Sequence, residues 1–214
     1  AQFGYGGDVI TGSYNMSTSV TRMLITSPAD PNYRKLRALK SACNHYMFYS
    51  QNFDFAVHYE DVATTPVNMI NIPSIFYGKC LKKGTLCLKY YISGTLAATA
   101  TDLRQNGELV QTQGPTTGSV VGTVMYNEGI ILLTSSATID SNVLVYDSPG
   151  HSTWATYGFG MNDGNSMDLT TLSASYALEF ESVSQLQNMT VLAKAPYGEL
   201  NHSNNPTYLK YTGQ

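Results

Sequence analysis

The stretch Thr85-Leu86-Cys87-Leu88-Lys89-Tyr90-Tyr91-Ile92 alternates apolar and more polar side chains at every second position. Successive side chains of a β-strand point to opposite faces of a sheet, so this period predicts a half-buried strand. Gly94 interrupts the pattern before a second strand-like run at residues 95–101, and we expect a bulge or kink there. The centre of the chain is therefore predicted to be β-structure.

Strand patterns also surround this centre, and turn residues separate them. Asn106-Gly107 and Asn127-Glu128-Gly129 are typical of hairpin turns. Pro73 breaks an apolar run at residues 70–77, which predicts an edge or a bend. Further strands are expected at residues 9–13, 19–26, 47–60, 108–112, 120–126, 130–134, 173–184 and 188–193, with the start of another at 208–211. This spacing predicts one mainly β, antiparallel, sandwich-like domain over residues 1–214, with candidate subdivisions near 66 and 140.

One short amphipathic helix is expected near the N-terminus. Asp30 is a candidate N-cap, and Pro31 suits a first helical turn. Leu36, Leu39 and Cys43 recur at helical spacing. Four of the twelve Lys and Arg residues lie in the same segment, namely Arg34, Lys35, Arg37 and Lys40. They are either a solvated helix face or a candidate protein interface with an acidic neighbour.

The composition favours a protein that assembles with neighbours. Only 13% of the residues are charged, about half the usual share, whereas 43% are hydrophobic and 16 are Tyr. Tyr offers rigid contact area with a hydrogen-bonding tip. The net charge of −3 argues against a nucleic-acid-binding protein, which needs a clustered basic face. The sequence contains no run of 18 apolar residues, so we expect no membrane span.

Motifs that carry catalysis are missing from the sequence. The four histidines are scattered and stand in no zinc-binding spacing. The Gly-x-Ser-x-Gly motif of serine hydrolases does not occur. A glycosidase would need a close pair of carboxylates, and the sequence nominates none. We therefore expect no catalytic residues, no metal ligands, no cofactor and no enzymatic activity.

Two lesser features leave alternatives open. Trp154, Tyr157 and Phe159 are a candidate contact for a sugar ring or a partner, or else they pack in the core. Cys80 and Cys87 flank Lys83-Gly84, and a two-residue turn there would place them opposite each other as a cross-strand pair. The odd count of three cysteines instead favours reduced thiols.

Several unusual strings resemble virion structural proteins of contractile-tailed, T-even-like marine bacteriophages. They include Ile72-Pro73-Ser74-Ile75-Phe76-Tyr77-Gly78, Leu88-Lys89-Tyr90-Tyr91-Ile92-Ser93-Gly94, Asn106-Gly107-Glu108-Leu109-Val110 and Leu200-Asn201-His202-Ser203-Asn204-Asn205-Pro206. The resemblance implies a building block of the particle, in the tail, baseplate or fibres rather than the capsid. It also implies that the chain continues beyond Gln214 into further β-structure, and it supplies no catalytic residues.

The sequence thus predicts a non-enzymatic subunit of a phage particle that acts through protein–protein interfaces. Its expected partners are copies of itself and other virion proteins, after assembly in the cytoplasm of the bacterial host. The alternatives are a fibre or adhesin module that binds host-surface glycan, a capsid-associated protein, and a hydrolase of host-surface polymers.

Overall fold

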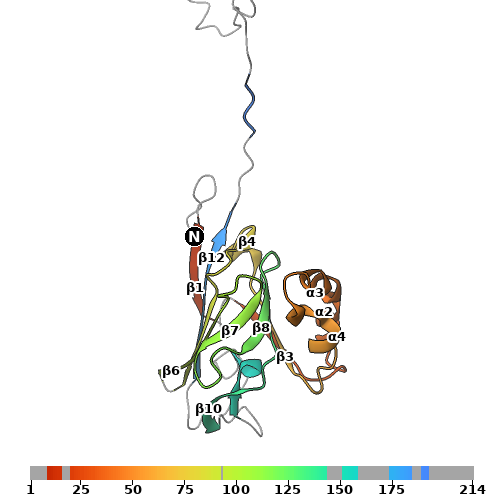
Figure 1. Ribbon diagram of the computed structural model, residues 1–214, viewed down its shortest axis with the longest axis vertical. Coiled ribbons are helices and arrows are strands. Elements are labelled where there is room, and N and C mark those ends of the chain that lie inside the picture. The colour runs from red at the N-terminus through yellow and green to blue at the C-terminus, as the bar shows by residue number, and fades with distance from the viewer. Residues whose placement is uncertain are drawn as a thin grey trace, which may run out of the picture.

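The computed structural model describes residues 9–15, 20–92, 94–143, 151–158, 174–184 and 189–192. Within these residues, nine strands are hydrogen-bonded in one antiparallel row in the order β1-β12-β5-β6-β7-β8-β9-β3-β2 (Figure 1). The short β4 pairs with β12 beside this row, and β10 pairs with β11 in a small separate sheet. The strands are β1 (Val9–Asn15), β2 (Thr21–Ile25), β3 (Val67–Asn71), β4 (Cys80–Leu81), β5 (Cys87–Ile92), β6 (Thr95–Thr101), β7 (Glu108–Gln113), β8 (Val120–Met125), β9 (Ile130–Leu133), β10 (Thr138–Val143), β11 (His151–Thr153) and β12 (Ala174–Val183).

The helices are short, and most of them form one group beside the sheet. We call residues 33–58 the helical lobe; Figure 1 shows it next to β3 and β8. It contains α2 (Tyr33–Ala38), α3 (Lys40–Tyr46), η1 (Gln51–Phe53) and α4 (Phe55–His58), whereas η2 (Ser74–Phe76) and η3 (Trp154–Thr156) lie later in the chain. Among the described residues, no helix is long and apolar enough to cross a membrane.

The single predicted helix is two helices in the structure. Asp30 does not cap α2 directly: its Oδ1 accepts a hydrogen bond from the backbone N–H of Asn32 at 2.7 Å, and Asn32 occupies the N-cap position. Leu39 ends α2 and precedes α3. The predicted apolar stripe is present, because Leu36 and Cys43 are fully buried and Leu39 is partly buried.

The strand expected at residues 47–60 is wrong. Two polar side chains start short helical turns there: Ser50 accepts from the N–H of Asn52 at 3.1 Å, and Asp54 accepts from the N–H of Ala56 at 3.0 Å. Such local caps stabilise helical backbone at its first turn. The alternating Phe53 and Phe55 are both buried, but from helical turns rather than from a strand.

Each face of the sheet buries its own core. The inner core lies on one face and takes Leu88, Tyr90, Ala98, Ala100, Leu109, Val124, Ile131, Leu133 and Leu178 from six strands. The lobe core lies between the other face and the helical lobe, and includes Leu36, Phe53, Phe55, Tyr59, Val67, Met69, Met125 and Leu132. Along β9, Ile131 and Leu133 belong to the inner core and Leu132 to the lobe core, as alternation in a strand requires.

The η3 segment lies inside the curve of the sheet. The Tyr157 hydroxyl donates to the carbonyl oxygen of Ala177 in β12 at 2.6 Å, and the Asn68 amide in β3 donates to the Tyr157 carbonyl at 2.7 Å. β12 and β3 are six steps apart in the row, so a flat sheet would hold them roughly 29 Å apart. Because one tyrosine bridges them, the sheet must curve strongly around η3.

A mainly β protein with a short N-terminal helical segment is therefore confirmed, but two stacked sheets are not seen as such, because the nine strands share one hydrogen-bonded row. Gly94 forms the turn of the β5–β6 hairpin, with φ at +78°, instead of a bulge within a strand. The register shift in that hairpin falls between Tyr90 and Tyr91.

Other strand predictions have mixed outcomes. β12 confirms the strand expected at residues 173–184, and β8 and β9 confirm the predicted hairpin. In the 70–77 run, β3 ends at Asn71 and η2 follows Pro73; β3 lies between β9 and β2, not at an edge. Residues 189–192 belong to no strand, and residues 208–211 lie outside the described part.

Candidate functional site

A small pocket lies where the helical lobe meets the turns at one end of the sheet. Its volume is about 130 Å³, below the roughly 300 Å³ at which small-molecule sites usually begin. Three tyrosines, two amides and two basic side chains line it: His45, Tyr46, Tyr49, Lys83, Asn106, Tyr126 and Asn127. The wall therefore combines aromatic rings with hydrogen-bonding groups.

Asp102 fixes the sheet side of this pocket. Its buried carboxylate accepts hydrogen bonds from the N–H of Gly84 at 2.6 Å and of Leu86 at 3.0 Å, and from the Tyr126 hydroxyl at 3.0 Å. Burial raises the pKa of Asp102 above its ordinary value, while these hydrogen bonds oppose the rise. Asp102 thus holds the β4–β5 turn against Tyr126 and positions the pocket wall.

Lys83 stands on that turn above two aromatic rings. Its Nζ lies 5.1 Å from the centre of the Tyr49 ring and 5.5 Å from that of Tyr126. An ammonium group within about 6 Å of a ring centre is attracted by the electron-rich ring face. Lys83 thereby links the turn after α3 to the sheet.

Two of the three pocket tyrosines, Tyr46 and Tyr126, donate hydrogen bonds to carboxylates. Tyr46 donates to Glu128 at 2.8 Å, and burial together with this carboxylate raises its pKa. Burial and Asp102 likewise raise the pKa of Tyr126. Both phenols therefore stay protonated at neutral pH and cannot serve as general bases. In the described part of the chain, no group of three or more His, Cys, Asp or Glu side chains is arranged to hold a metal ion.

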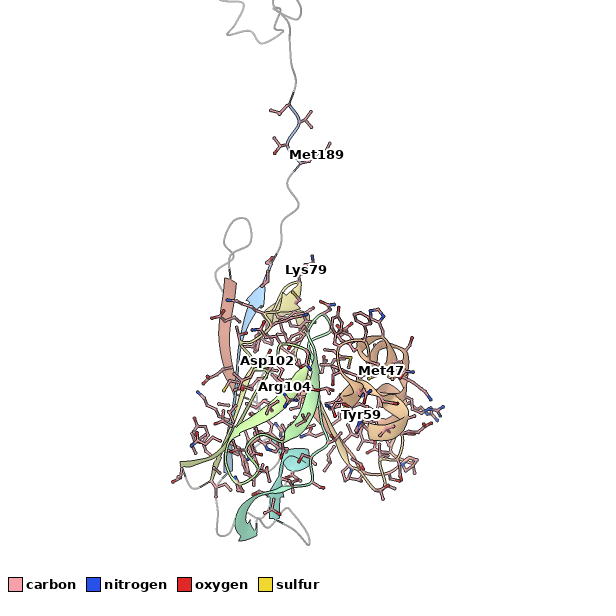
Figure 2. The ribbon with its side chains drawn as sticks, in the orientation of Figure 1. Met47, Tyr59, Lys79, Asp102, Arg104 and Met189 are labelled. Carbon is pink, nitrogen blue, oxygen red and sulfur yellow. The ribbon has the colours of Figure 1, made fainter. Side chains whose placement is uncertain are left out.

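A second polar junction attaches the lobe to β7. The almost buried Glu108 accepts hydrogen bonds from Ser50 at 2.5 Å and Asn52 at 2.8 Å, both in the lobe, and from Arg104 at 2.5 Å. Burial raises the pKa of Glu108, but these hydrogen bonds outweigh it and bring the pKa to about 2. We call this the Glu108 junction; its Arg104, labelled in Figure 2, is about half exposed.

The four predicted interface cations lie on the surface of the lobe. Arg34, Lys35, Arg37 and Lys40 are all exposed. Lys40 forms an ion pair with Glu60 at 3.7 Å, and Lys35 Nζ lies 3.5 Å from the Met23 sulfur. Their role as an interface stays a prediction.

Sequence reasoning missed the exposed apolar residues of the same lobe. Three consecutive residues that follow α3 are exposed. They are Met47, Phe48 and Tyr49, with 37%, 90% and 50% of their surfaces exposed. Val57 on α4 is 70% exposed. The predicted strand at residues 47–60 would have placed alternate side chains in a core, so the wrong secondary structure hid this surface.

For Trp154 and Tyr157, the alternative that they pack in the core is the one that the structure bears out. Trp154 and Tyr157 are fully buried in the inner core, with ring centres 5.4 Å apart, and the Trp154 Nε1–H donates to Gln111 at 2.8 Å. Neither side chain is accessible to a sugar. Phe159 lies outside the described residues.

Cys80 and Cys87 are free thiols and do not face each other across a hairpin. β4 and β5 pair in succession with β12, so Cys80 lies opposite Val183 and Cys87 opposite Glu179. Lys83-Gly84 therefore turns between two strands that share an edge of β12.

The fold and these features define a mainly β protein with an attached helical lobe that carries an exposed apolar and basic surface. Comparison with known proteins finds no matching family model, no matching curated protein and no matching solved structure.

Proposed function

We propose that this chain is a non-enzymatic structural subunit of a tailed-phage particle, in the tail, baseplate or fibres, that acts through protein–protein interfaces. The observation that carries the proposal is the exposed row Met47-Phe48-Tyr49 on the helical lobe. Adjoining large apolar side chains on a surface are typical of interaction sites, whereas single exposed ones are ordinary.

The charge pattern supports the same proposal. The chain has few charged residues overall, yet the lobe that exposes Phe48 and Val57 also exposes four cations. Apolar anchors give an interface most of its affinity, and a charged rim selects the partner. An acidic rim on the neighbouring subunit would complement Arg34 and Arg37. The phage assignment itself rests on the resemblance of the sequence strings.

Site chemistry adds indirect support. The pocket between the helical lobe and the sheet is small, and two of its three tyrosines donate hydrogen bonds to carboxylates. The burial of Trp154 and Tyr157 leaves the glycan-binding alternative without its motivating surface. We also propose that the fold is sandwich-like, in that two parts of the one curved sheet face each other: β12 and β5 face β3 and β9 across the inner core.

The test is to isolate the native protein with its partners and image the complex by cryo-electron microscopy. We expect repeated copies in which a neighbour covers Phe48 and the four cations. Phe48→Ser should weaken assembly in light scattering at least tenfold, whereas Leu103→Ser, at a 66%-exposed site on the β6–β7 connection, should leave it unchanged. A native protein that stays monomeric and without partners at all concentrations would contradict the proposal.

A further inference from the structure

The segment Met189-Thr190-Val191-Leu192 has the composition of a strand but no strand partner among the described residues. Met189, Val191 and Leu192 are 90%, 71% and 94% exposed. In Figure 2, Met189 stands clear of the sheet and of the helical lobe. An uncharged run that contains Thr, Val and Leu fits a pleated, half-buried surface and is unfavourable in water.

The same chain presents a sheet edge that is chemically unprotected. β1 ends the row of strands and pairs only with β12 among the described strands. Its sequence, Val9-Ile10-Thr11-Gly12-Ser13-Tyr14-Asn15, contains no charged residue and no proline. Exposed edge strands usually carry Lys, Pro or an inward-pointing charge because these prevent pairing with another chain.

The opposite edge of the sheet is a poorer acceptor. β2 contains the charged Arg22, and its five residues are followed directly by the segment that leads into the helical lobe. Met23 of β2 packs against the lobe core and lies 3.5 Å from the Lys35 ammonium group. β1 is both longer than β2 and free of charged residues.

We infer that residues 189–192 of one copy add as a strand to the outer edge of β1 in a second copy. Main-chain hydrogen bonds to the edge provide affinity in such strand addition, and alternate side chains provide specificity. Four residues fit within the seven of β1. The inference rests on the proposed function, because it names the partner as another copy and places a second interface away from the helical lobe.

The first experiment compares two substitutions at one donor position in the full chain. Val191→Pro removes a backbone N–H and fixes φ at about −65°, which together disfavour pairing as a strand, whereas Val191→Thr keeps the N–H and the branched side chain. By light scattering over a concentration series, Val191→Pro should raise the dissociation constant of the oligomer at least tenfold. Val191→Thr should change it less than about twofold.

The second experiment locates the acceptor by cross-linking two different variants, both with Cys80→Ser and Cys87→Ser. One variant carries Thr190→Cys and the other Thr11→Cys or Gly12→Cys, so that both faces of β1 are sampled. We expect a disulfide-linked pair that contains one chain of each variant. A matched control, Thr117→Cys at an exposed loop position, should give no such pair with Thr190→Cys.

The outcomes separate this inference from the proposed function. An oligomer that is unchanged by Val191→Pro and gives no cross-link to β1 would overturn the strand addition and leave the structural role standing. A wild-type protein that stays monomeric and isolates without partners would overturn both. Loss of the oligomer in Val191→Pro together with cross-linking to β1 would support both.

Discussion

The inner core and the lobe core lie on opposite faces of the same sheet, but they are joined to it differently. The inner core packs aliphatic and aromatic side chains of consecutive strands around the buried Trp154 and Tyr157. The lobe core instead joins short helices to the sheet, and charged and polar contacts tie it there at its margin, chiefly at Glu108 and Tyr46.

This difference bears on how each face responds to perturbation. Apolar packing depends on shape and little on pH, whereas a carboxylate whose pKa is lowered by folding, such as Glu108, stabilises the fold only while it is ionised. The helical lobe also contains helices of only four to seven residues, which are unstable unless packed. We therefore expect the lobe to open before the sheet, at a lower free energy.

The largest effect is expected from the inner core. Trp154→Ala removes a fully buried indole and its hydrogen bond to Gln111, and should lower the free energy of unfolding by about 3–5 kcal/mol. Chemical denaturation measures this loss of free energy of unfolding. The matched control is Phe48→Ala, which truncates a 90%-exposed aromatic side chain and should change stability by less than about 0.5 kcal/mol. Equal effects would contradict the assignment of Trp154 to the core.

The next effect tests whether the lobe depends on a charge. Folding lowers the pKa of Glu108 from 4.5 to about 2, so its stabilisation is complete above the ordinary pKa and is lost as the pH falls from about 5 to 2. This shift corresponds to about 3 kcal/mol. Glu108→Gln should remove that pH-dependent component from unfolding curves and lower hydrogen-exchange protection in the lobe more than in β5.

Its control is Glu179→Gln, which breaks the more exposed ion pair with Lys89 at 2.7 Å. That substitution should lower stability by about 1 kcal/mol or less, because water screens exposed pairs. If Glu108→Gln lowered protection in β5 as much as in the lobe, the two faces would unfold as one unit.

A smaller loss of stability is expected from two glycine substitutions. Comparing them distinguishes backbone strain from contact between the lobe and the sheet. Gly107 and Gly94 both have positive φ, +92° and +78°. A Cβ on Gly107 would lie 2.6 Å from the Phe53 ring of the lobe, whereas one on Gly94 would meet nothing within 4 Å. Gly94→Ala should therefore lower stability by about 1 kcal/mol through strain alone, and Gly107→Ala by about 1–3 kcal/mol more. Equal losses of stability in the two variants would show that the Phe53 ring moves aside without cost.

The smallest effect is expected at the lobe surface. Lys40 pairs with Glu60 at 3.7 Å, and both side chains are about half exposed. Lys40→Ala should change the free energy of unfolding by no more than about 0.5 kcal/mol. In the native assembly the same substitution should weaken binding if the basic residues form an interface. A loss of stability above 1 kcal/mol would instead assign Lys40 to the fold.

The candidate site was only partly predictable. The basic cluster at residues 34–40 is visible as a run of residue types, and its exposure follows from the buried positions of Leu36 and Cys43 on the same helices. The exposed Phe48 could not be found, because alternation at residues 47–60 is equally compatible with a strand. The caps Ser50 and Asp54 were the available signal for helical turns.

The sequence by itself determined most strands of the inner core and the turn positions at Asn106-Gly107 and Asn127-Glu128-Gly129. Period-two alternation at residues 86–92 and the dipeptide Asn106-Gly107 act over a few residues, so local patterns were sufficient. Only the tertiary structure decided that Trp154 and Tyr157 lie inside the curved sheet, that Glu108 joins the lobe to β7, and that β1 ends the row. Each of these depends on residues distant in the chain, whose partners no local period can specify.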